Sequence, residues 1–186
     1  MLGSIILAAG KGTRMKSNIP KVLHKAAGRQ LIWHVCEAVS RLGAMENIVV
    51  VGYGAQKVQE FLGNRYKFAL QEEQLGTGHA VMQAQDQVSD KIETVMVLCG
   101  DTPLLTTSTL EKLWEHHRNT GAAATVLSAV LPNPTNYGRI IRSSEGCLRG
   151  IVEERDANSK ERMINEINTG TYCFNKQELF KALERI

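Results

Sequence analysis

Short apolar runs alternate with apolar residues at helical spacing through the first two thirds of the chain. The runs at 4–8, 48–51 and 95–99 have the length of buried strands. Helical spacing fills the stretches between and after them, at 31–42, 56–62, 80–88 and 108–117. We expect Gly43 to end the first helix and Ser108, with Glu111, to cap the fourth. This alternation predicts an α/β fold with a doubly wound, Rossmann-like, mostly parallel sheet.

The pattern changes after residue 121. Strand-like stretches follow one another directly at 122–131, 139–142, 148–153 and 167–174. We expect them to form a mixed-sheet extension of the same domain, so that residues 1–186 are one domain with halves at 1–121 and 122–186. A last helix, capped by Asn175, carries Leu179, Leu183 and Ile186 on one face. Because the chain ends on this apolar face, we expect a truncation at the C-terminus.

Charge, apolar runs and cysteines limit which ligands and which cellular compartment we expect. The net charge of +3 is small and its notable cation cluster lies in residues 11–29, so we expect a local anionic ligand and no nucleic acid. No apolar run approaches the length of a membrane span, and the N-terminus lacks the pattern of a signal peptide. The four cysteines, which form no C-x-x-C pair, are interpreted as buried thiols in a reducing compartment: Cys36, Cys99, Cys147 and Cys173. We expect a cytoplasmic protein without a membrane partner.

A glycine-containing loop with several cations follows the first predicted strand. Gly10 and Gly12 allow backbone N–H groups to approach phosphate oxygens, and the loop also carries the cations Lys11, Arg14, Lys16 and Lys21. It is not a P-loop, because Thr13-Arg14 follows Gly12 where that motif needs Lys-Ser/Thr. It is not the dinucleotide fingerprint either, since Met15 replaces the third glycine. The loop therefore predicts a polyphosphate site of another kind, with a solvated basic loop as the alternative.

Further polar residues follow the predicted strands. Asp101 comes directly after the strand at 95–99, where a carboxylate beside a polyphosphate can bind Mg²⁺; the alternative is a turn-capping Asp. The polar turn at 71–79 offers the Gln71 amide and exposed backbone groups to a nucleobase edge, although Thr77 could be a plain helix cap. His79 is interpreted as structural. Glu153 and Asn168, at strand ends, suit a sugar's hydroxyl or amide groups, or else mark a bulge or an edge.

The ordered set of these motifs resembles one family. The motifs are L-A-A-G-K-G-T-R-M, P-K-V-L-H, Q-x-E-Q-L-G-T-G-H-A, G-D-x-P-L, Y-G-R-I, I-V-E and E-I-N-T-G. Together they resemble the sugar-phosphate nucleotidyltransferases, and in particular the N-terminal uridyltransferase domain of bifunctional bacterial N-acetylglucosamine-1-phosphate uridyltransferase/glucosamine-1-phosphate acetyltransferase. The match covers nearly the whole chain. Any one motif is weak, but their order is specific.

The resemblance implies a role for particular residues. Those implied to bind the uridine nucleotide are Leu7, Ala8, Ala9, Gly10, Lys21, Gln71, Gly76 and Thr77. Arg14 and Lys21 would be catalytic and would meet the phosphates, and Asp101 would be the Mg²⁺ ligand. Those implied to contact the sugar substrate are Cys99, Gly100, Asp101, Gly138, Glu153 and Asn168. The implied reaction joins UTP and N-acetylglucosamine 1-phosphate to give UDP-N-acetylglucosamine and pyrophosphate, within cell-envelope precursor synthesis.

Two departures from the family pattern matter. Cys99 stands where members often have Tyr. The family also has a second metal ligand, an Asn, beyond residue 186, and a trimer-forming β-helix that carries acetyltransferase activity. We therefore expect a monomer without acetyltransferase activity. The alternatives are a uridine-nucleotide-binding fragment with little turnover, or a nucleotidyltransferase for another base or sugar phosphate.

Overall fold

The computed structural model describes residues 1–185, apart from the side chain of Arg14. The chain divides into two compact units. The first unit comprises Met1–Thr125 and Tyr172–Ile186, and the second unit comprises Val126–Thr171. Ile186, expected on the last helix, lies outside the described residues.

A mostly parallel sheet forms the centre of the first unit. Its strands are β1 (Leu2–Ala8), β4 (Glu46–Val51), β5 (Lys67–Leu70) and β6 (Thr94–Cys99), in the order β5-β4-β1-β6. All three contacts between them are parallel. The C-terminal residues of β10 (Glu166–Asn175) add an antiparallel strand beside β6. The predicted α/β fold with a mostly parallel sheet is confirmed.

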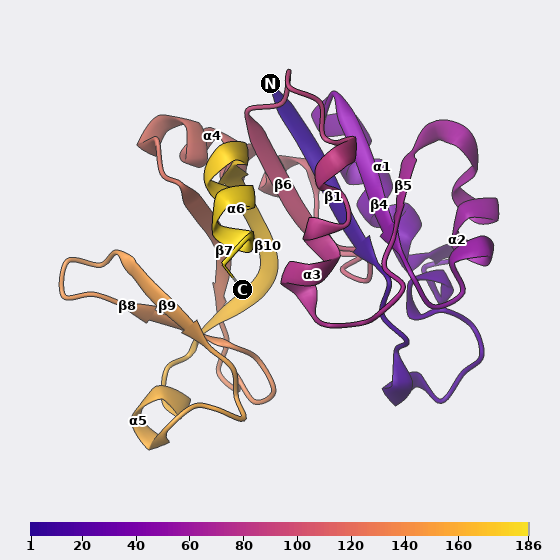
Figure 1. The fold of residues 1–186 in the computed structure, drawn as a ribbon. Helices are drawn as coiled ribbons and strands as arrows, with labels where there is room; N and C mark the ends of the chain where they lie inside the picture. The colour runs from indigo at the N-terminus through magenta and orange to yellow at the C-terminus, as the bar shows by residue number, and fades with distance from the viewer. Residues whose placement is uncertain (186) are drawn as a thin grey trace. The chain divides into compact units, whose positions relative to one another are not determined.

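Helices cover both faces of this sheet. α3 (Thr77–Met82) packs against α6 (Lys176–Leu183) and β1, and Figure 1 shows both helices in front of the strands. α1 (Leu31–Leu42) packs against β1 and α4 (Thr107–Thr120), while α2 (Ala55–Leu62) follows β4. The sheet is therefore doubly wound, as the sequence predicts.

Alternation along the strands divides the core between the two faces. Ile5, Ile48 and Val95 belong to one buried cluster with residues of α3 and α6. Their chain neighbours Ile6 and Val49 are also fully buried, on the opposite face. Each fully buried aliphatic side chain contributes about 1.5–3 kcal/mol. Burial on both faces explains why these strands are continuous apolar runs in the sequence.

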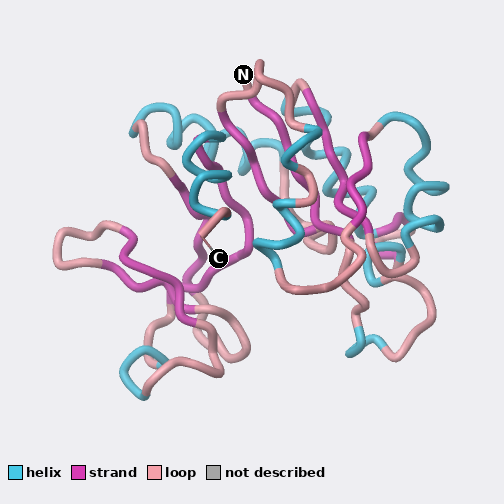
Figure 2. The backbone as a smooth tube through the Cα atoms, viewed as in Figure 1, coloured by secondary structure: helices cyan, strands magenta, loops and turns pink. Residues whose placement is uncertain are grey.

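Short elements connect the larger ones in the first unit. They are η1 (Thr13–Met15), η2 (Lys21–Leu23), β2 (Lys25–Ala26), β3 (Arg29–Gln30), η3 (Gly63–Arg65) and η4 (Gln85–Gln87). β2 and β3 form a small antiparallel hairpin within the long loop after β1. Figure 2 shows this loop leaving the carboxyl end of β1.

Antiparallel strands form most of the second unit. β8 (Arg139–Arg142) pairs with β9 (Leu148–Val152), and Ile167 of β10 pairs with Arg139. β7 (Ala124–Val130) begins in the first unit and continues into the second. α5 (Ser159–Arg162) is one helical turn with a capping box made by Asn158 and Glu161.

Several expectations need correction. The helix expected at 80–88 is α3 followed by η4, so it starts earlier and is interrupted. Ser108 does not cap α4; Thr106 does, and its hydroxyl accepts a bond from the Thr109 N–H at 3.2 Å. Cys147 is exposed rather than buried. Residues 172–185 group with Met1–Thr125 in the first unit, and the expected single domain with halves at 1–121 and 122–186 stays a prediction.

Within the described part of the chain, no helix combines the length and apolar character needed to cross a membrane.

Candidate functional site

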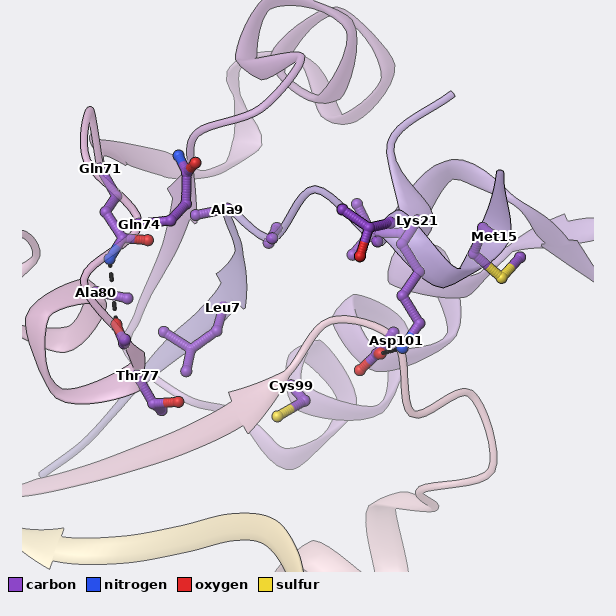
Figure 3. A pocket seen from close by; sticks show the side chains of 16 residues that line it. Leu7, Ala9, Met15, Lys21, Gln71, Gln74, Thr77, Ala80, Cys99 and Asp101 are labelled. Carbon is purple, nitrogen blue, oxygen red and sulfur yellow. Dashed lines mark hydrogen bonds and ion pairs between the residues drawn. The ribbon is translucent and has the colours of Figure 1, made fainter. Parts of the chain in front are cut away.

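A cavity of about 590 Å³ opens at the carboxyl ends of β1 and β6 in the first unit. Sheets of this kind bind their ligands at that edge. Figure 3 shows the cavity between the loop after β1, the segment before α3 and the end of β6. Its lining consists of Leu7, Ala8, Ala9, Gly10, Gly12, Thr13, Met15, Lys21, Val22, Gln71, Gln74, Gly76, Thr77, Ala80, Cys99 and Asp101. All eight residues implied for the nucleotide therefore come together here.

Gly12 shapes the loop on the cation side of the cavity. Its φ is +60°, in the left-handed region that favours glycine. A Cβ atom at this position would lie 2.7 Å from Lys21 Cβ. The Met15 N–H donates to the Gly12 carbonyl at 2.8 Å, which closes the η1 turn. A glycine is thus needed here both for the turn and for the close approach of Lys21.

Lys21 and Asp101 form an ion pair at the mouth of the cavity. Lys21 lies in η2 and Asp101 follows β6, so the fold brings together two residues 80 positions apart, and Figure 3 shows their contact. Both side chains are partly exposed. The turn after β6 is fixed by the Thr102 hydroxyl, which donates to the Cys99 carbonyl at 2.7 Å. The site therefore presents one ammonium and one carboxylate that an incoming charged ligand can reach.

Gln71 lies on the opposite side of the cavity and is buried. Its backbone N–H donates to the Val51 carbonyl at 2.8 Å, which fixes the residue beside the end of β4. Its side-chain amide nitrogen donates to the Gly76 carbonyl at 3.1 Å and lies 3.0 Å from His79 Nδ1. Figure 3 shows the bond from the Gln71 side chain to the Gly76 carbonyl. Gln71 therefore connects the sheet to the segment that begins α3.

Cys99 and Gly100 differ in their relation to the cavity. Cys99 lines it, and burial raises the pKa of its thiol to about 11, so the group is neutral near pH 7 and unsuited to act as a nucleophile. Gly100 is buried behind the lining, and its N–H donates to the Leu7 carbonyl at 2.9 Å. Gly100 supports the β1–β6 contact rather than lining the cavity.

The second unit brings three of the expected sugar-binding residues together. The Asn168 N–H donates to the Gly138 carbonyl at 2.8 Å, and the Asn168 side-chain oxygen accepts a bond from the Gly170 N–H at 3.0 Å. A Cβ atom at Gly138 would lie 3.0 Å from Glu153 Oε1. A larger residue at 138 would thus displace the exposed Glu153 carboxylate.

Arg139 is the buried cation of this second cluster. Only 1% of its surface is exposed, and it donates to Glu154 Oε2 at 2.6 Å and to the Tyr137 carbonyl. These partners are the chain neighbours of Glu153 and Gly138, so Arg139 connects the two segments that carry the cluster. Arg139 has no predicted role, although a charged residue between Gly138 and the apolar pair Ile140-Ile141 is a usable signal of a buried ion pair.

Some lining residues have no predicted role, and the side chain of Arg14 lies outside the part of the chain that the structure describes. The lining residues without a predicted role in binding are Thr13, Met15, Val22, Gln74 and Ala80. Arg14 lies in η1, but its side chain is outside the described part of the chain. Among the described residues, no three His, Cys, Asp or Glu side chains form a metal-binding cluster.

Solved structures share this fold. A Bacillus anthracis protein provisionally assigned as a glucose-1-phosphate thymidylyltransferase, solved with sucrose, has a TM-score of 0.82 at 20% identity, over 95% of this chain and 72% of that chain. HddC from Yersinia pseudotuberculosis, complexed with GMP-PN, has a TM-score of 0.75 at 23% identity, over 97% of this chain and 79% of that chain. The fold is therefore that of the nucleotide-diphospho-sugar transferases.

The sequence gives the family. The model of the MobA-like NTP transferase domain matches residues 4–167, and the chain belongs to that family. The chain is also 55% identical over 183 residues to the bifunctional protein GlmU of Heliobacterium modesticaldum, and 54% identical over 183 residues to that of Geobacillus thermodenitrificans. Each match covers 98% of this chain and 40% of the relative, so the chain spans less than half the length of these proteins.

Proposed function

We propose that the chain transfers UMP from UTP to N-acetylglucosamine 1-phosphate, giving UDP-N-acetylglucosamine and pyrophosphate. The observation that carries this proposal is the Lys21–Asp101 ion pair at the mouth of a nucleotide-sized cavity that contains Gln71 on its other side. The family supports the class of reaction, and the similarity to the GlmU proteins supports the substrates that the sequence motifs imply.

The first unit supplies the nucleotide contacts in this proposal. Gln71 and the Gly76-Thr77 backbone face the base, while Leu7 to Gly10 border the nucleoside. A phosphate oxygen of the acceptor attacks the α-phosphorus of UTP, and the bond from that phosphorus to the bridging oxygen of the β-phosphate breaks. Pyrophosphate leaves with the electron pair. Lys21 and Arg14 stabilise the negative charge that moves onto it, and no protein nucleophile is needed.

The residues at the cavity mouth fit Mg²⁺. This ion usually keeps several waters and takes one or two carboxylates together with substrate phosphates. Asp101 is one such carboxylate, and it is partly exposed. Its ion-pair partner, Lys21, has a long flexible side chain that can move to another acceptor. Bound there, Mg²⁺ would supply positive charge beside the α-phosphate and the pyrophosphate. Lys21 is then free to donate its N–H groups to phosphate oxygens instead of to Asp101.

The second unit supplies the acceptor contacts in this proposal. Gly138, Glu153 and Asn168 converge within it, and their backbone and carboxylate groups suit the hydroxyl and acetamido groups of N-acetylglucosamine. The single-domain organisation, the monomeric state and the cytoplasmic location stay predictions from the sequence.

The test is release of pyrophosphate from UTP, N-acetylglucosamine 1-phosphate and Mg²⁺ by this chain alone. We expect release that requires all three components, and its loss in Asp101→Ala but not in the control Asp90→Ala, an exposed acidic residue. Binding of UDP without release would contradict the proposed reaction and favour the nucleotide-binding alternative. Equal rates with CTP, or with glucose 1-phosphate, would favour the alternative of another base or acceptor.

A further inference from the structure

The orientation of the Gln71 amide is fixed by chemistry. The atom 3.1 Å from the Gly76 carbonyl oxygen must be the amide nitrogen, because two carbonyl oxygens at this distance would repel. The amide oxygen is then directed away from that carbonyl. Figure 3 shows it turned toward the side of the cavity where Leu7 and Ala9 lie. Gln71 thus offers the cavity a hydrogen-bond acceptor.

His79 takes the second proton of the same amide group. Its Nδ1 lies 3.0 Å from the Gln71 amide nitrogen, and a ring nitrogen that faces a donor must be the unprotonated one. The side-chain amide nitrogen of Gln83, one turn further along, lies 3.2 Å from Nε2 and donates to the His79 carbonyl at 3.4 Å.

One bond to Gly76 alone would fix the amide weakly. If His79 were absent, the buried Gln71 amide would have one N–H without a partner, and the segment before α3 would lose a contact with the helix. A buried unpaired donor is costly, so the Gln71 amide would turn to find another partner and its oxygen would lose the orientation described above. The ring of His79 removes that freedom.

We propose that His79 is a positioning residue for base selection, an inference that rests on the proposed function. By keeping the Gln71 amide oxygen toward the cavity, His79 selects a pyrimidine that has an N–H donor at N3, as uracil has. Cytosine presents an acceptor at that position and would face the amide oxygen without a hydrogen bond. The geometry thus assigns to a helix residue outside the cavity lining a part in nucleotide choice.

The experiment compares binding of UDP and CDP by titration calorimetry, which needs no turnover. We expect the wild-type chain to prefer UDP, and His79→Ala to lower the ratio of UDP to CDP affinity about tenfold, as the loss of one hydrogen bond to a buried polar group predicts. His79→Asn places an oxygen near the position of Nδ1 and should keep the ratio within about threefold of wild type. His79→Gln reaches the position of Nε2 instead and should behave like His79→Ala.

Several results would overturn this inference. They are a wild-type chain without preference for UDP, a His79→Ala variant in which both affinities fall by the same factor, or a His79→Asn variant as unselective as His79→Ala. The exposed His116 on α4 gives the control His116→Ala, which should leave the ratio unchanged. If the wild type prefers UDP but releases no pyrophosphate, the proposed reaction fails while the inference on His79 stands.

Discussion

The polar sites of the two units are held in place by different interactions. In the first unit, buried aliphatic residues fill both faces of a parallel sheet, and the cavity lies where its strands end. In the described residues of the second unit, the buried apolar side chains are Ile140, Ala157 and Ile167, besides Pro134. Ion pairs connect its strands instead. We therefore expect substitutions at the cavity of the first unit to change the reaction rate while the fold is kept. Substitutions at the ion pairs of the second unit should first lower its local stability.

After the loss of release in Asp101→Ala, the largest expected effect is that of Lys21→Ala. Removing a cation that stabilises departing pyrophosphate should lower kcat about 100-fold and change KM for UTP by less than about threefold. Steady-state kinetics of pyrophosphate release measures both. Lys25→Ala, which removes an exposed cation from the same loop, serves as the control. A raised KM with unchanged kcat would show that Lys21 only binds the nucleotide.

Arg139→Met should produce the largest loss of stability in the second unit. It leaves the partly buried Glu154 carboxylate without its ion-pair partner, at a cost of about 2 kcal/mol. Amide hydrogen exchange should accelerate in β8 and β9 and stay unchanged in β1. Arg149→Met, at an exposed position of β9, should have little effect. Equal acceleration in β1 would show that the two units unfold together.

Gly12 and Gly121 give a matched pair of substitutions. Their φ angles are +60° and +61°, so alanine should cost about 1 kcal/mol of backbone strain at either position. A Cβ atom at 121 meets nothing within 4 Å, whereas one at 12 meets Lys21. Gly12→Ala should therefore also lower kcat, about tenfold, while Gly121→Ala should lower only the melting temperature. Similar kinetics in the two variants would contradict the role given to the Lys21 position.

The smallest expected effect concerns Glu166 and acid. Two bonds from the Arg142 guanidinium, at 2.6 and 2.8 Å, together with one from the Ser128 hydroxyl, lower the pKa of Glu166 to about 2. A lowered pKa means stability that is complete above the unfolded value of 4.5 and lost as the pH falls toward 2. Because Arg142 is half exposed, we expect about 1 kcal/mol.

Hydrogen exchange in the second unit measures this effect. Exchange of wild type and Glu166→Gln should differ at pH 7 and converge as the pH falls to about 2, after correction for intrinsic exchange rates. A difference that persists at low pH would mean that the carboxylate charge is not what connects these strands.

The two units also differ in how many of their strands and helices can be predicted from the sequence. The strands of the first unit are predictable because burial on both faces makes them continuous apolar runs. β5 was missed because it is short, begins with an exposed Lys67 and ends with an exposed Leu70. α5 was missed because its single turn is polar and is stabilised by the Asn158 capping box rather than by a buried face.

Within the site, the glycine loop and the strand-end residues were predictable from the order of elements. The ion pair of Lys21 with Asp101 was not, because it depends on how η2 folds back over Gly12. The bond from Gln71 to His79 was not predictable either. This bond connects the end of a strand to the first turn of a helix. Which atom of the Gln71 amide faces His79 depends on the folded geometry and cannot be told from the residue types.

The second unit is an insertion within one strand connection of the first. The chain leaves the first unit after Thr125 and returns at Tyr172, and the Asn175 N–H donates to the Ala123 carbonyl at 2.9 Å, so the exit and the return run beside each other. Under the proposed function, acceptor recognition is thus encoded in one uninterrupted gene segment. Recombination that exchanges this segment would give a new acceptor to an unchanged nucleotide site, and an enzyme lineage could diversify its sugars without rebuilding its parallel sheet.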